Sequence, residues 1–271
     1  MAIARVNGIE IYYEVHGRGE PLLLIMGLGA NATGWSSQVP EFSREYQVIA
    51  FDNRGAGRSD KPNEPYSMAQ MADDAQGLMT ALGIESAHVF GMSLGGMIAQ
   101  EFALRYPEQV RTLILGGTMA GGPSAIFAGP EVVQQFISLA GLPVLQAIEA
   151  GLALLYSEEY IKAHKGELVR RALLNAHLTA PMYAIQWQFM AIVGFNTVAR
   201  LGQIEAPTLV LSGTADIVMP SENARVLVDG IAGARLVELE GAGHGFLVEK
   251  AGEANAAVLG FLQEQQASAA A

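Results

Sequence analysis

The sequence predicts an α/β protein with a doubly wound, mostly parallel sheet of eight strands and an inserted helical segment. Two observations carry this prediction. Short apolar runs recur along the chain without alternating with polar residues, which is typical of strands buried on both faces of a parallel sheet. Helical patterns separate most of these runs, and such alternation favours right-handed crossovers within one sheet.

The first two strands are predicted to form a hairpin. Residues 3–6 and 9–15 flank Asn7-Gly8, a dipeptide that accepts positive φ in a tight turn. The other six predicted strands are apolar runs at 22–25, 48–51, 88–90, 113–115, 208–211 and 236–239.

Helical spacing predicts helices over 68–82, 94–106 and 254–263. The first ends at Gly83, and the second ends before Pro107, which cannot continue a helix smoothly. Residues 265–271 are expected to form a frayed tail.

The alternation breaks for roughly ninety residues between 115 and 208, which is too long for a structureless loop. Four helical patterns fill this stretch, at 131–140, 144–156, 158–175 and 181–193. We expect them to form a helical cap over one end of the sheet. The predicted organisation is a core of residues 1–118 and 202–271, with the cap at 119–201.

Composition excludes several kinds of partner and site. The formal net charge of −11 would repel a phosphate backbone or an anionic membrane, so we expect neither nucleic acid nor membrane as a partner. The absence of cysteine removes disulfides, thiolate metal sites and a cysteine nucleophile. The scattered histidines and the lack of a G-x-G-x-x-G motif predict no metal and no cofactor.

No secretory signal or long apolar span is visible, so a cytoplasmic location is expected. A homodimer is left open.

The segment 91–95 carries the motif that points to chemistry. It reads Gly-Met-Ser-Leu-Gly, a G-x-S-x-G pattern between a predicted strand and a predicted helix. A turn this sharp forces Ser93 into a strained conformation that exposes its hydroxyl, and glycines on both sides leave room for it. In the helix that follows, Gly95, Ala99 and Ala103 form a face of small residues that can lie close to the sheet.

A serine hydroxyl needs a general base, and the base needs an orienting acid. Of five histidines, His244 follows the last predicted strand within a glycine-rich loop, at the edge of a parallel sheet where active sites gather. Asp216 follows the strand at 208–211, at the same edge. The stretch 116–122, after the preceding strand, has no carboxylate. We therefore predict Ser93 as nucleophile, His244 as base and Asp216 as acid.

An oxyanion hole must hold the charge that develops on the substrate carbonyl. The predicted donors are the backbone N–H groups of Leu94 and of Leu28, which follows the strand at 22–25. Gly27 and Met92, beside these residues, are predicted to contact substrate. Trp187 and Met190 of the insertion are the candidates for an acyl pocket. Further apolar candidates in the insertion are Phe127, Phe136, Leu139, Leu145, Met182, Phe189 and Phe195, many of which would simply pack the helices together.

With these residues in place, the chain resembles the α/β-hydrolase superfamily over nearly its whole length, and within it small bacterial carboxylesterases and 3-oxoadipate enol-lactonase-like hydrolases. The segment 51–60 resembles the loop that these families carry after their fourth strand. There Asp52 and Arg54 are interpreted as structural, through a local ion pair. The chain departs from many relatives in having Met26-Gly27 where they have His-Gly. Ser93 excludes the subgroups that use an aspartate nucleophile.

The resemblance and the residues together predict a serine hydrolase that cleaves small carboxylic esters through an acyl-enzyme, that is, a carboxylesterase. The insertion contains no arginine cluster, which favours a neutral ester over a dicarboxylate-type lactone. Two alternatives stay open: a lactonase with the same triad, and a non-hydrolytic ligand-binding protein or lyase of the same fold. Slow turnover with tight product retention would distinguish a ligand receptor from an esterase.

Overall fold

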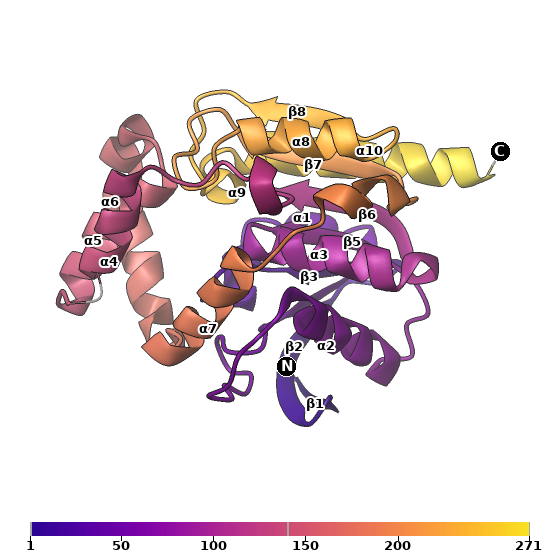
Figure 1. Cartoon of the computed structure of the whole chain (residues 1–271), viewed down its shortest axis with the longest axis horizontal. Coiled ribbons are helices and arrows are strands. Elements are labelled where there is room, and N and C mark those ends of the chain that lie inside the picture. Colours follow the sequence, from indigo (N-terminus) through magenta and orange to yellow (C-terminus); the bar gives the residue numbers. More distant parts are fainter. Residues whose placement is uncertain (1, 140, 271) are drawn as a thin grey trace.

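The computed structural model describes residues 2–139 and 141–270. Eight strands form one sheet in the order β1-β2-β4-β3-β5-β6-β7-β8, and all pair in parallel except β1 with β2 and β2 with β4. The predicted eight-stranded, mostly parallel sheet is confirmed (Figure 1). The strands are β1 Ala2–Val6, β2 Ile9–His16, β3 Glu20–Ile25, β4 Tyr46–Phe51, β5 Ala87–Met92, β6 Val110–Gly116, β7 Thr208–Gly213 and β8 Arg235–Leu239.

The hairpin at the amino end of the sheet follows from its turn residues. Val6 pairs with Ile9, and the two residues between them have positive φ, 49° at Asn7 and 81° at Gly8. A two-residue loop with both φ values positive matches the right-handed twist of the flanking strands. The Asn-Gly dipeptide therefore sets the register of β1 on β2.

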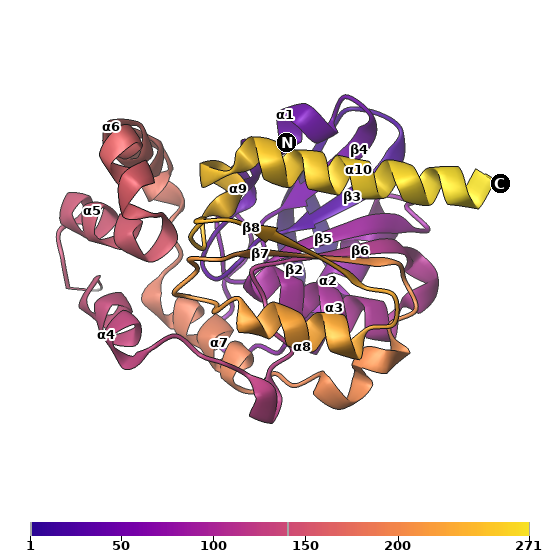
Figure 2. The ribbon, with the colours of Figure 1, turned by 90° about the horizontal axis from the view of Figure 1, so that it is seen from above.

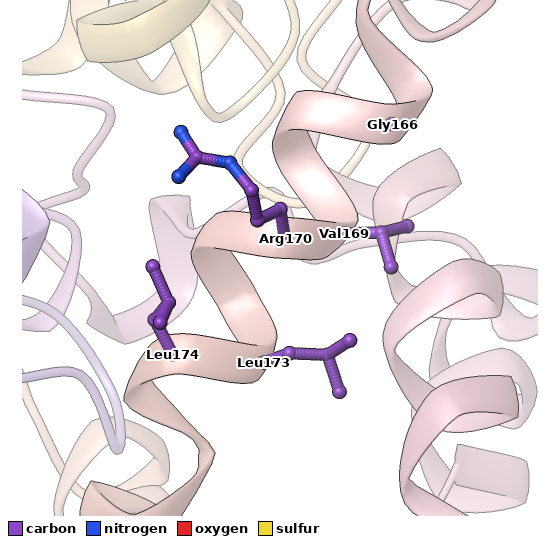
Figure 3. A pocket seen from close by; sticks show the side chains of 5 residues that line it. All are labelled: Gly166, Val169, Arg170, Leu173 and Leu174. Atoms are coloured by element: carbon purple, nitrogen blue, oxygen red, sulfur yellow. The ribbon is translucent and has the colours of Figure 1, made fainter.

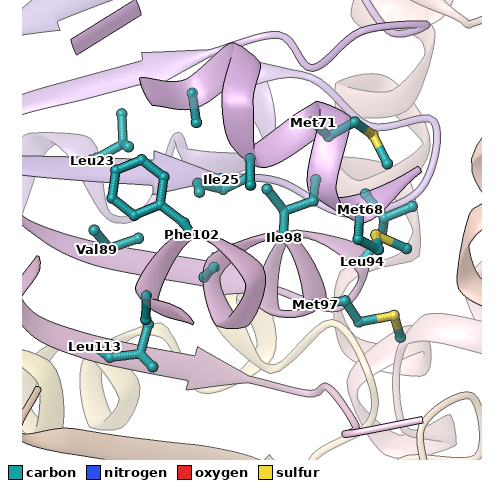
Figure 4. Packing of buried hydrophobic residues seen from close by; sticks show 14 of the residues in the cluster. Leu23, Ile25, Met68, Met71, Val89, Leu94, Met97, Ile98, Phe102 and Leu113 are labelled. Atoms are coloured by element: carbon teal, nitrogen blue, oxygen red, sulfur yellow. The ribbon is translucent and has the colours of Figure 1, made fainter. Parts of the chain in front are cut away.

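Helices cover both faces of the sheet. In Figure 2, α2, α3 and α8 lie on one face, whereas α1, α9 and α10 lie on the other. These helices are α1 Val39–Phe42, α2 Met68–Ala81, α3 Leu94–Arg105, α8 Glu222–Gly230, α9 Phe246–Glu249 and α10 Ala251–Ala270. Each face has its own hydrophobic cluster. In the first, side chains of β3, β5 and β6 meet those of α2 and α3 (Figure 4).

Two expectations about helices differ from the structure. The sequence patterning predicts no helix over 222–230, yet α8 packs Leu227 into the first cluster. The prediction of a frayed tail is wrong for residues 265–270, because α10 continues to Ala270. Gln266 on this last stretch donates to Glu20 at 2.6 Å, which fixes the end of the helix to the start of β3. Residue 271 of the predicted tail lies outside the described residues.

Four helices separate β6 from β7: α4 Pro130–Leu139, α5 Val144–Leu155, α6 Glu158–Asn175 and α7 Met182–Val193. They begin and end within a few residues of the predicted patterns, although residue 140 is not described. Figure 1 shows α4, α5 and α6 grouped beside the sheet rather than stacked on its faces, with α7 between this group and the core. Short 3₁₀ helices connect other elements, at Ala32–Trp35, Pro107–Gln109, Gly122–Ser124, Ala176–Leu178 and Val198–Gln203.

Within the described ranges, no helix combines the length and the apolar character needed to cross a membrane.

Candidate active site

Ser93 occupies a strained turn between β5 and α3. Its φ of 56° and ψ of −121° lie in a region that is essentially restricted to glycine. The backbone of Gly95 approaches Gly91 closely, because a Cβ added to Gly91 would lie 2.2 Å from the carbonyl oxygen of Gly95. A Cβ added to Gly95 would lie 2.0 Å from the carbonyl oxygen of Ile25. Both glycines of the G-x-S-x-G motif are therefore required by close backbone approach.

Hydrogen bonds from β6 and the loop after it hold this turn in place. The N–H of Ser93 donates to the carbonyl of Gly116 at 2.8 Å. The carbonyl of Ser93 accepts the N–H of Gly96 at 2.9 Å and the hydroxyl of Thr118 at 2.7 Å. A strained backbone conformation persists only where several surrounding contacts hold it. These hydrogen bonds hold both the N–H and the carbonyl group of Ser93.

His244 and Asp216 come together from the loops after β8 and β7. Nδ1 of His244 lies 2.7 Å from Oδ2 of Asp216, and both side chains are largely buried. The two loops are in direct contact, because the N–H of Ala215 donates to the carbonyl of Ala242 at 3.0 Å. A carboxylate bound to Nδ1 fixes the ring and leaves Nε2 as the acceptor, which is the arrangement a general base needs.

The ring of His244 lies against the same loop that holds Ser93. A Cβ added to Gly117 would be 3.4 Å from Cε1 of His244 and 3.0 Å from the end of the Met92 side chain. Gly117 directly follows Gly116, whose carbonyl binds the N–H of Ser93. The structure thus gathers the serine turn and the His–Asp pair at the carboxyl ends of β5, β6 and β7.

The loop after β3 lies on the other side of Ser93. A Cβ added to Gly27 would be 3.0 Å from Cβ and 3.5 Å from Oγ of Ser93, so the loop passes close to the serine side chain. Over the described chain, the N–H groups of Leu28 and Leu94 donate to no backbone or side-chain acceptor. Leu94 is also the first residue of α3, where the helix dipole favours negative charge. Unpaired donors on both sides of a serine are what an oxyanion hole requires.

The remaining predicted contacts do not converge on Ser93. Met92 is 5% exposed and belongs to the hydrophobic cluster under α9 and α10. Trp187 donates from Nε1 to Asn63 at 3.0 Å, and Met190 is 57% exposed on α7. A role for Trp187 and Met190 in substrate binding therefore stays a prediction, and burial speaks against one for the Met92 side chain.

A surface hollow of about 350 Å³ lies along α6, away from the Ser93 turn. Figure 3 shows Arg170 and Leu174 pointing to one side of the helix, with Val169 and Leu173 pointing to the other. Because Gly166 and these four side chains line it and no member of the triad does, it is not the catalytic cleft. Across the part of the chain that is described, no group of three histidines or carboxylates could hold a metal ion.

The expected ion pair between Asp52 and Arg54 is wrong, since each residue has a different partner. Asp52 accepts from Nε of Arg58 at 2.8 Å and also binds the backbone N–H of Ala32. Burial opposes the charge of Arg58, but the hydrogen bond to Asp52 together with electrostatic attraction to Asp52 and to nearby acidic groups outweighs that cost and raises the pKa of Arg58. Arg54 instead pairs with Asp74 of α2 at 2.8 Å, with both side chains 2% exposed. Asp52 and Arg54 are both buried and paired, which agrees with the structural role expected of them in this loop.

Two residues of the site's surroundings escaped prediction. Gln188 of α7 accepts the N–H of Gly29 at 2.8 Å, in the loop that carries Leu28. Glu249 of α9 accepts the N–H of Gly243, next to His244, at 3.0 Å. The one available signal is that Gln188 is one of only two glutamines, with Gln186, in the otherwise apolar segment 182–193.

Comparison with known proteins agrees with this fold. The model of the α/β hydrolase fold family matches residues 20–251, so the chain belongs to this family. It is a hydrolase of the α/β fold, as the resemblance implied.

Its relatives are named for different activities. The chain is 31% identical to a putative carbamate hydrolase RutD of Azorhizobium caulinodans, covering 97% of this chain and 99% of that protein. It is 32% identical to a 2-hydroxy-6-oxo-6-phenylhexa-2,4-dienoate hydrolase of Comamonas testosteroni, covering 94% and 92%. The crystal structure of the enol-lactonase from Burkholderia xenovorans LB400 superposes with a TM-score of 0.84 at 29% identity, covering 97% and 100%. Membership of this family therefore does not identify the type of bond that the protein cleaves. That question has to be argued from the site.

Proposed function

We propose that the protein is a carboxylesterase that hydrolyses small, neutral esters through an acyl-enzyme on Ser93. The observation that carries the proposal is the strained turn of Ser93 beside the His244–Asp216 pair. A serine fixed in this way, with unpaired N–H groups on either side, can attack an ester carbonyl and stabilise the resulting oxyanion.

The reaction would proceed in two steps. Oγ of Ser93 attacks the carbonyl carbon while Nε2 of His244 takes the hydroxyl proton, and the N–H groups of Leu28 and Leu94 bind the oxyanion. When the tetrahedral intermediate collapses, the C–O bond to the alcohol breaks and His244 gives the alcohol its proton. Water then attacks the acyl-enzyme, with His244 taking its proton and returning it to Oγ, which releases the carboxylic acid.

The character of the insertion supports a neutral substrate. Residues 119–201 carry five acidic and five basic side chains, so the net charge of −11 resides in the rest of the chain. Large apolar side chains of the insertion are at least 40% exposed, among them Phe127, Phe136, Met182, Phe189 and Met190. We propose that the insertion acts as the cap, and that part of this apolar surface contacts the acyl group.

The test compares the wild type with Ser93→Ala on p-nitrophenyl esters of increasing acyl length. Turnover by the wild type alone supports the proposal, and the profile over chain length then measures the acyl pocket. Equal activity of both would refute Ser93 as nucleophile. An inactive wild type would refute hydrolysis of simple esters and leave a lactonase or a ligand-binding role to be tested.

A lactonase is the second candidate, because the enol-lactonase superposes over 97% of this chain. A lactone is a cyclic ester, so the same triad would open it, with the leaving alkoxide staying attached to the acyl group. Lactones and p-nitrophenyl carbamates assayed beside the esters decide between the candidates: the class with the highest kcat/KM is the substrate class.

A further inference from the structure

Gln188 connects the insertion to two loops of the core with one buried side chain. It lies on α7 and is fully buried. Its Oε1 accepts the N–H of Gly29 at 2.8 Å, and its Nε2 donates to the carbonyl of Arg54 at 2.7 Å. Gly29 follows β3 and Arg54 follows β4, so the amide joins the ends of two neighbouring strands.

The bond at Gly29 fixes one end of the proposed oxyanion loop. Gly29 is the neighbour of Leu28, and its φ of 64° marks a tight change of direction. The other end of the loop is fixed by the core itself, since Nδ2 of Asn53 donates to the carbonyl of Met26 at 2.7 Å. The peptide N–H of Leu28 therefore lies between one bond made by the core and one made by the insertion.

The second bond of Gln188 makes the amide itself rigid. Arg54, whose carbonyl it binds, is held by the buried ion pair with Asp74. The side chain of Ile185, one turn earlier on α7, approaches Gly29 as well, at 3.5 Å from the position of an added Cβ. The loop after β3 is thus positioned by α7 through a polar bond and an apolar contact.

We propose that Gln188 is a positioning residue for the oxyanion hole: through the N–H of Gly29 it orients the N–H of Leu28 toward the substrate carbonyl oxygen. This rests on the proposed function of Ser93 and deepens it. An oxyanion donor acts only within a narrow range of distance to the developing charge. A small shift of the loop therefore reduces the stabilisation of the transition state more than it reduces the affinity for substrate. The insertion thereby becomes part of the catalytic geometry.

A purely structural role for Gln188 predicts a different result, and Asn223 provides the matched control. Asn223 of α8 is also a buried amide that binds one N–H and one carbonyl across the junction with the insertion, and it makes a local bond to the carbonyl of Pro220 at 3.0 Å. It accepts the N–H of Ile126 at 3.0 Å and donates to the carbonyl of Ile126 at 2.8 Å. These bonds do not touch the loop after β3.

The experiment compares Gln188→Met with Asn223→Leu on the best p-nitrophenyl ester. We expect Gln188→Met to lower kcat roughly 10- to 100-fold with KM nearly unchanged, since the loss falls on an oxyanion donor. Inhibition by an alkyl trifluoromethyl ketone, which forms a tetrahedral oxyanion with Ser93, should weaken by a similar factor. Asn223→Leu should lower the Tm comparably and leave kcat within about twofold of the wild type.

The activity of the variant Gln188→Glu should be restored in part by lowering the pH. As a protonated acid this side chain accepts from Gly29 and donates to Arg54, whereas the carboxylate would face the Arg54 carbonyl without a proton. The ratio of its kcat to that of the wild type should therefore rise as the pH is lowered.

The inference is overturned if Gln188→Met keeps the wild-type kcat and ketone affinity while its Tm falls as in the control. If the wild type does not cleave esters, the proposed function fails separately. The rate at which a fluorophosphonate labels Ser93, followed by intact mass, then decides the inference, because phosphonylation uses the same donors. Equal rates in the wild type and Gln188→Met overturn it, and a slower variant supports it.

Discussion

Asp216 holds the ring of His244 with only one of its two carboxylate oxygens. Oδ2 lies 2.7 Å from Nδ1 of His244, whereas Oδ1 accepts the backbone N–H groups of Val218 and Met219 at 2.9 and 2.8 Å. Because two N–H donors fix Oδ1, the carboxyl group cannot rotate without losing them. The orientation of His244 is thus determined by the backbone of the loop after β7.

The first prediction concerns Asp216→Asn. The amide oxygen should stay at the Oδ1 position, because the two N–H groups require an acceptor there. The NH₂ group then faces Nδ1 of His244 and favours the ring tautomer with its proton on Nε2, which cannot act as a base. We expect kcat to fall by about 10⁴-fold with little change in Tm. An ester assay and a thermal melt measure both, and a variant that keeps a tenth of the wild-type kcat would contradict this role.

The second prediction separates strain from chemistry at Ser93. Ser93→Ala and Ser93→Gly both remove the nucleophile, but only glycine adopts φ 56°, ψ −121° without strain. Relief of about 1–3 kcal/mol of strain, less about 0.5–1 kcal/mol for the added freedom of the unfolded chain, should make the glycine variant more stable by up to about 2.5 kcal/mol. Urea unfolding of the two variants at equal m-values provides the measurement. An alanine variant more stable than the glycine variant by about 0.5–1 kcal/mol, which is the contribution of the unfolded chain alone, would show that the turn is not strained.

Features set by local backbone chemistry were predictable from the sequence. The Asn7-Gly8 turn requires positive φ at both residues, and the motif around Ser93 requires glycine at 91 and 95, so the residue types alone indicate the conformations. The parallel sheet follows in the same way from runs that are apolar on both faces.

Features set by pairing across the chain were not predictable. Arg54 lies two residues from Asp52 but binds Asp74, which reaches it only because α2 folds back over the sheet. Gln188 likewise meets Gly29, 159 residues earlier, because α7 lies beside the core. No pattern within a short window encodes such a partner.

The third prediction compares two neighbouring aspartates of α2. Asp74 forms a buried ion pair with Arg54, whereas Asp73 pairs with Arg105 where both side chains are more than a third exposed. Asp74→Ala leaves the buried guanidinium of Arg54 facing Glu64, a mostly exposed carboxylate 3.7 Å away, and we expect a loss of about 3–5 kcal/mol in unfolding free energy. Asp73→Ala should cost no more than about 1 kcal/mol, because solvent screens an exposed pair. Equal losses in chemical denaturation would show that burial does not determine the contribution of these pairs.

The fourth prediction concerns the pH dependence of stability through His88 on β5. Burial lowers the pKa of His88, and its hydrogen bond to Glu20 does not compensate. Nδ1 lies 2.9 Å from the hydroxyl of Thr112, and the side chain is 3% exposed. Below a pH of about 6.5 the unfolded chain binds a proton at this histidine and the folded chain does not, so the free energy of unfolding falls with decreasing pH. The loss continues until the pH reaches the lowered pKa of the folded state.

His88→Gln removes this titration while keeping an amide that can bind Thr112. Its free energy of unfolding should therefore decline less steeply than that of the wild type as the pH falls from 6.5, with His164→Gln on the exposed face of α6 as the control. The titration of Glu20 does not overlap with this comparison. A hydrogen bond from Gln266 lowers the pKa of Glu20, so its contribution to stability is lost only at a pH below the range in which His88 acts. Urea unfolding at several pH values measures the slopes. Parallel slopes for the wild type and His88→Gln would show that His88 takes up its proton equally well in the folded protein.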